Sequence, residues 1–130
     1  MNQYQINSSK NDWDDVIYKT KNEFGQLLNL TFECEGYSNL IYWNVVFWIG
    51  KRKNGYEWNQ QTGRDGLKSL LWAKSCIIDF INNVDHKNKI NHLCIGWDDN
   101  RRKKTYMWGL KDLGFTLTRI ERRLCLHKII

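Results

Sequence analysis

The chain has 130 residues and a formal net charge of +6, a length typical of one domain and a charge that attracts phosphates on nucleotides or nucleic acids. Its 42% hydrophobic and 26% charged residues are ordinary for a globular protein and argue against disorder. No stretch approaches the roughly 20 apolar residues that a membrane-spanning helix needs. We therefore expect one soluble domain over residues 1–130, with residues 1–12 frayed and no secretory signal in the polar start.

The cysteines and histidines are spread along the chain and show no spacing typical of a metal site. Each cysteine lies in an apolar stretch, where a thiol usually packs as a small hydrophobic side chain. This usage is typical of the reducing cytoplasm. For the histidines we expect a surface or strand-face role. The residues concerned are Cys34, Cys76, Cys94, Cys125, His86, His92 and His127.

Apolar patterns predict three strands in the first half of the chain. Residues 15–19 form a short strand-like stretch, and residues 24–35 place apolar side chains at every second position, as a half-buried strand does. A polar turn follows at residues 35–39. Residues 40–50 are an almost unbroken run of β-branched and aromatic side chains, which predicts a central strand buried on both faces.

The second half of the chain changes to helical spacing. Residues 66–82 place apolar side chains on one helix face, on which Lys74 is the single charged residue. Asp65 can cap the N-terminus of this helix. Residues 93–97 then alternate as a strand. A second helix is expected from residue 100 to about residue 113, ended by a left-handed Gly114. The residues expected on its buried face are Tyr106, Leu110 and Leu113. The remainder forms either one strand or a tight hairpin.

This order of elements predicts an α/β fold with a mixed, mostly antiparallel sheet flanked by two helices. The strand–helix–strand unit in the middle implies one right-handed parallel crossover. The earlier strands are joined by short turns and are therefore expected to be antiparallel.

A strand and then a second helix follow the predicted crossover helix, and both carry residues of a recognisable motif. A strand leads through residues 92–99 to Asn100, and the following helix bears Tyr106 and ends in Leu113-Gly114-Phe115. This arrangement resembles the second motif of the GNAT superfamily of acyltransferases, and the resemblance covers about residues 40–130. It implies a GNAT-like fold with an acyl-coenzyme A such as acetyl-CoA as cofactor, and Asn100 among the cofactor contacts.

The resemblance also implies a catalytic role for Tyr106, because the helical Tyr of the family protonates the departing coenzyme A thiolate. Typical members carry this Tyr four residues before the Gly of the Gly-Phe pair, where this chain has Leu110. Tyr106 lies one turn earlier on the same helix face. A core tyrosine with its hydroxyl at the rim is the alternative.

Residues 60–71 resemble the pyrophosphate-binding loop of the family, approximately Gln/Arg-x-x-Gly-x-Gly/Ala. A Gly-bearing turn that enters a helix lets backbone N–H groups approach phosphates. Asp65 departs from the pattern, because its carboxylate repels phosphate unless neighbouring cations offset it; as the alternative, Asp65 only caps the helix. The cofactor contacts that the resemblance implies in this stretch are Gln60, Gly63, Arg64, Gly66 and Lys68.

An acyltransferase of this kind needs a group that accepts a proton from the amine. The acids near the expected cleft are Glu57, Asp98 and Asp99. Glu57 is the candidate base, although its position in the insert 51–61 does not follow from the pattern. Asp98 and Asp99 alternatively favour the N-terminus of the second helix.

A basic run at residues 101–104 is the candidate partner-binding site. Positive charges on the first turns of a helix oppose the helix dipole, so their presence there indicates use in binding; a solvated face is the alternative. The residues are Arg101, Arg102, Lys103 and Lys104.

Two functions from different classes follow. The first is transfer of an acyl group from acyl-coenzyme A to an amine. The second is a non-catalytic GNAT-like module that binds a protein, a nucleotide or a nucleic acid, such as a phage inhibitor of a host defence system. The Asn-, Lys- and Ile-rich, proline-free composition is typical of an AT-rich genome, which suits a phage or a firmicute.

Overall fold

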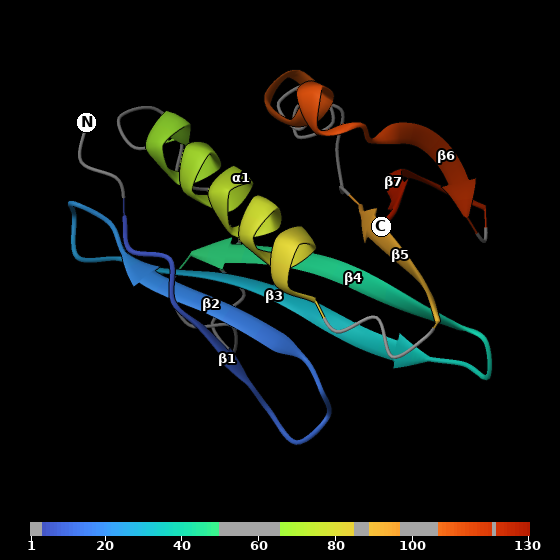
Figure 1. Cartoon of the computed structure of the whole chain (residues 1–130). Coiled ribbons are helices and arrows are strands. Elements are labelled where there is room, and N and C mark those ends of the chain that lie inside the picture. The colour runs from blue at the N-terminus through green and yellow to red at the C-terminus, as the bar shows by residue number, and fades with distance from the viewer. Residues whose placement is uncertain (1–3, 50–65, 85–88, 97–106, 121) are drawn as a thin grey trace.

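The computed structural model describes residues 4–49, 66–84, 89–96, 107–120 and 122–130. These residues form a seven-stranded sheet with the order β1-β2-β3-β4-β5-β7-β6 (Figure 1). The strands are β1 (Ser8–Lys10), β2 (Val16–Lys21), β3 (Leu27–Gly36), β4 (Leu40–Ile49), β5 (Ile90–Ile95), β6 (Thr116–Ile120) and β7 (Arg123–Ile129). The helix α1 spans Gly66–Asn83, and a 3₁₀ helix spans Lys111–Leu113.

The sheet confirms the predicted mixed topology. Strands β4 and β5 pair in parallel, and every other neighbouring pair is antiparallel. The helix α1 makes the crossover between the two parallel strands, as the helical spacing of residues 66–82 predicts. Of the two alternatives for the C-terminal stretch, the structure contains the hairpin, with β6 and β7 paired. Strand β1 is not among the predicted strands.

The described end of the second helix also follows the prediction. Residues 107–110 are helical and lead into the 3₁₀ helix, after which Gly114 adopts a left-handed conformation with φ of 84°. Two bonds hold this end in place. Lys74 pairs with the Asp112 carboxylate at 2.8 Å, and Lys128 Nζ donates to the carbonyl of Leu113 at 2.7 Å. The lysine on the apolar face of α1 therefore has a partner on the following helical segment.

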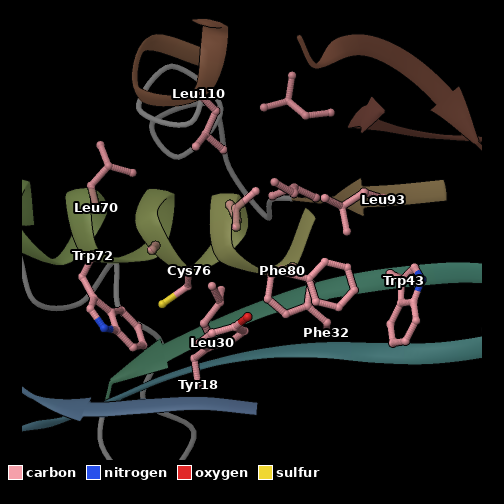
Figure 2. Packing of buried hydrophobic residues seen from close by; sticks show 14 of the residues in the cluster. Tyr18, Leu30, Phe32, Trp43, Leu70, Trp72, Cys76, Phe80, Leu93 and Leu110 are labelled. Atoms are coloured by element: carbon pink, nitrogen blue, oxygen red, sulfur yellow. The ribbon is translucent and has the colours of Figure 1, made fainter. Parts of the chain in front are cut away.

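One face of the sheet carries the core, and α1 covers it. Phe80 of α1 stacks on Phe32 of β3 with ring centroids 3.9 Å apart, and Trp43 of β4 meets the edge of Phe80 at 4.9 Å (Figure 2). All three side chains are at most 4% exposed. Near the other end of the helix, Trp72 lies against Phe47 of β4 at 5.8 Å. These contacts show that α1 runs antiparallel to β4 across the sheet.

Polar groups inside this core have partners. Asn91 of β5 is fully buried; its Oδ1 accepts from Trp43 Nε1 at 2.7 Å and its Nδ2 donates to the carbonyl of Lys89 at 3.0 Å. The Tyr18 hydroxyl donates to the Asp79 carboxylate at 2.7 Å. Burial, followed by the hydrogen bond and charge of Asp79, raises the pKa of Tyr18. Tyr18 therefore stays neutral and serves as a donor that fixes the helix on β2.

We predict that Phe80→Ala lowers the free energy of unfolding by about 3–5 kcal/mol, because it removes a large buried ring and leaves a cavity between α1 and β3. Ile78→Ala on the same helix is the matched control, since Ile78 is 39% exposed, and it should cost less than about 1 kcal/mol. Urea denaturation of both variants measures the difference. Equal losses would show that the helix does not pack on the sheet through Phe80.

Candidate functional site

The candidate site lies at the edge of the sheet where β4 and β5 end. Their parallel ladder runs from Leu40 with Ile90 to Val45 with Ile95, whereas β4 continues beside β3 as far as Ile49. In Figure 1 the two strands begin side by side and their arrowheads point apart. Ligands of open α/β sheets bind outside the carboxyl ends of parallel strands, so this edge is the natural place for one.

The N-terminus of α1 lies at the same edge. The helix begins at Gly66, and its first residues lie beside the carboxyl end of β4, as the contact of Trp72 with Phe47 shows. The first turn of α1 carries no acidic side chain. A helix N-terminus bears about half a positive elementary charge and presents unpaired N–H groups, which suits an anionic ligand.

Two of the predicted cofactor contacts, Gly66 and Lys68, lie on this first turn of α1. Gly66 begins the helix, and the Lys68 ammonium forms an ion pair with the Glu23 carboxylate in the turn between β2 and β3. Lys68 is thus positioned by an acidic neighbour that the spacing of the sequence does not reveal. A phosphate ligand of Lys68 has to compete with this carboxylate.

The other predicted site residues lie outside the described residues, and their roles stay predictions. They are Glu57, Gln60, Gly63, Arg64, Asn100, Arg101, Arg102, Lys103, Lys104 and Tyr106. The structure does place Leu110, which stands where the GNAT resemblance would call for a tyrosine. Leu110 is 3% exposed and belongs to the same hydrophobic core as Leu70 of α1 (Figure 2). An apolar side chain suits this position because it completes the contact between the two helical segments.

The buried thiols are poorly suited to act as nucleophiles. Burial, together with the neighbouring Cys125, raises the pKa of the Cys94 thiol to about 12, and burial also raises the pKa of Cys76. A thiol with a raised pKa is protonated at neutral pH and is a poor nucleophile. No group of three or more potential metal ligands occurs within the described ranges.

Two histidines that are far apart in the sequence come together on the sheet. His92 of β5 and His127 of β7 place ring nitrogens Nδ1 and Nε2 at 2.8 Å, and Tyr42 of β4 packs on His92 with ring centroids 4.8 Å apart. The sequence suggests only separate strand-face histidines. The register of β5 with β7, which no local pattern encodes, creates the pair.

Comparison with protein-family models, with curated proteins and with solved structures finds no match. In the described part of the chain, no helix has the length and apolar character needed to span a membrane.

The close approach of the second helical segment to α1 allows a direct test. A Cβ added at Gly109 would lie 2.8 Å from Leu70 Cδ2, which is closer than real contacts allow. Gly109→Ala should therefore destabilise the protein by about 1–3 kcal/mol in urea denaturation, as overpacking of a core does. The control is Gly36→Ala, where an added Cβ meets nothing within 4 Å. A stable Gly109→Ala variant would contradict this packing.

Proposed function

We propose that this chain is a GNAT-like domain that binds an acyl-coenzyme A and transfers its acyl group to an amine. The observation that carries the proposal is the parallel β4–α1–β5 unit, in which the ladder stops at Val45 and Ile95 and the helix N-terminus lies at the same edge. The resemblance of residues 40–130 to GNAT motifs implies this unit, and the antiparallel neighbours on both sides agree with the mixed sheet that it implies.

The arrangement suits the three chemical parts of the cofactor. Its phosphates are attracted by backbone N–H groups and the dipole at the N-terminus of α1, with Gln60, Gly63, Arg64 and Lys68 as the candidate contacts. Its extended, amide-containing arm can hydrogen-bond to strand backbone where β4 and β5 diverge, as an added strand does. The thioester then lies near the point of divergence, beside the last residues of the parallel ladder.

Transfer proceeds by direct attack in this proposal. The neutral amine nitrogen forms a bond to the thioester carbonyl carbon, and the carbon–sulfur bond breaks with its electron pair on sulfur. The thiolate takes a proton from Tyr106, and the nitrogen releases a proton to Glu57. The products are an amide and free coenzyme A, and exchange of one proton with solvent at Glu57 and at Tyr106 returns both residues to their starting states.

Binding of the cofactor is the first test. We predict that isothermal titration calorimetry detects acetyl-CoA binding and that Arg64→Glu weakens it at least about tenfold, because charge reversal turns attraction for the phosphates into repulsion. The control is Lys10→Glu on β1, which makes the same change of net charge on an exposed residue of the outermost strand, separated from β4 by β2 and β3. It should bind as the unmodified protein does.

Two results would contradict the proposal. Loss of affinity in both variants would mean that only net charge matters. If the unmodified protein binds no coenzyme A at all, the acyltransferase proposal fails. The non-catalytic module, with Arg101–Lys104 as the partner site, then becomes the hypothesis to test.

The ion pair of Lys68 provides a second, independent prediction. If Lys68 contacts a cofactor phosphate, Glu23→Gln removes its competitor and should raise the affinity for acetyl-CoA by up to about fivefold, the range expected for an exposed ion pair. Glu33→Gln on β3 is the control for the loss of one negative charge. An unchanged affinity in Glu23→Gln would show that Lys68 serves the β2–β3 turn and not the cofactor.

A further inference from the structure

The two histidines lie on the face of the sheet opposite to α1. Leu93 and Ile95 of β5 and Leu126 of β7 belong to the core under the helix. Side chains alternate along a strand, so His92 and His127 point to the other face. Both rings are half-buried, with their centroids 5.1 Å apart.

The short distance between the rings limits how many protons the pair can hold. At 2.8 Å the two nitrogens share one hydrogen, so one ring donates and the other accepts. A single added proton leaves this bond intact, because an imidazolium donates to a neutral imidazole. A second added proton places N–H against N–H and two positive charges in contact. The unfolded chain, in contrast, binds a proton on each ring below about pH 6.5.

The surroundings do not offset the second charge. Burial and the neighbouring charge of His92 lower the pKa of His127. Of the carboxylates within the described ranges, none forms an ion pair with either ring; Glu35, on the strand beyond β4, accepts from the Tyr37 hydroxyl at 2.7 Å. On the same face of the sheet, the titratable or charged residues are Tyr42 of β4, Cys94 of β5, and Cys125 and Arg123 of β7, with Glu33 and Glu35 on the more distant β3. Strand β6 presents Thr116 opposite His127.

The pair also lies in the short ladder that joins the β6–β7 hairpin to the rest of the sheet. The ladder of β5 with β7 comprises four residue pairs, from His92 with Ile129 to Ile95 with Leu126. The hairpin β6–β7 joins the rest of the sheet through this ladder, because β6 pairs only with β7 among the described strands. A repulsion between His92 and His127 therefore acts directly on the attachment of the hairpin.

We propose that the His92–His127 pair is a pH-sensitive link that holds the β6–β7 hairpin on β5 near neutral pH and releases it in mild acid. The sign follows from proton linkage. The folded chain binds one proton fewer than the unfolded chain once both free rings are protonated. Stability is therefore fully present above about pH 6.5 and falls as the pH drops below it. A deficit of one proton corresponds to a tenfold fall of the folding equilibrium constant per pH unit.

The test compares the unmodified protein with His127→Gln and His86→Gln in urea denaturation from about pH 7.5 to about pH 5. The substitution at His127 keeps a hydrogen-bonding side chain, an amide, but removes the titrating ring. We expect the folding constant of the unmodified protein to fall about tenfold more per pH unit below pH 6 than that of His127→Gln. His86→Gln, which removes a histidine outside the pair, should keep the steep dependence. Equal slopes in all three proteins would overturn the proposal.

A measurement on the unmodified protein covers the case in which His127→Gln does not fold. NMR titration of the ring protons should show coupled curves, with one of the two rings still neutral at a pH where the other is charged. Hydrogen exchange, corrected for intrinsic rates, should show the amides of β7 opening in acid before those of β3. Independent protonation of both rings near pH 6.5, or uniform opening of the two strands, contradicts the link.

Discussion

The packing of α1 on β3 and β4 is the constraint on which the remaining structure depends. Parallel neighbours cannot be joined by a tight turn, so β5 can lie beside β4 only if the connecting helix packs on the sheet. The Phe80–Phe32 stack and the Trp43–Phe80 contact supply that packing. The bond from Trp43 Nε1 to Asn91 then fixes β5 directly to β4. The direction of α1, and with it the position of its N-terminus beside the end of β4, follows from these contacts.

Local pattern was sufficient to predict this central unit. The apolar run at residues 40–50 predicted a central strand, and the apolar spacing after Gly66 predicted a helix of about five turns. The expected burial of the strand on both faces was wrong, because Asn44 is exposed and Tyr42 and Val46 are half-buried on the face away from α1. Strand β1 was not predicted, because its three residues, Ser8–Lys10, are exposed and show no alternation of apolar and polar side chains. Its pairing with Val16–Tyr18 depends on the turn between them and on the neighbouring strand, which a short polar segment does not encode.

The candidate site was predictable in location but less so in its residues. Parallel strands bring their carboxyl ends to one edge whatever their sequence, so the edge follows from topology. The partners of individual side chains depend on contacts between segments distant in the chain. Lys68 meets Glu23 across 45 residues, and His92 meets His127 across 35. The burial of Leu110, in contrast, was predicted correctly, because its helical spacing alone places this apolar residue on the buried face.

The two halves of the sheet are held by different kinds of interaction. On β2, β3 and β4 the helix buries large aromatic and aliphatic side chains, which contribute most of the apolar burial. The C-terminal half adds polar links to a smaller apolar contact: Lys128 to the carbonyl of Leu113, Ile130 N–H to the carbonyl of Asn91, and the imidazole pair.

Polar links respond to pH and to ligands more than apolar burial does, because their strength depends on charge and on proton occupancy. Local opening of a fold follows its least stable contacts, and elements near binding sites are drawn from that group. The strand β5 belongs to both halves, since it is joined to the aromatic core through Leu93 and to the hairpin through His92. Among the described strands, β5 is therefore the one that joins the aromatic core to the C-terminal hairpin.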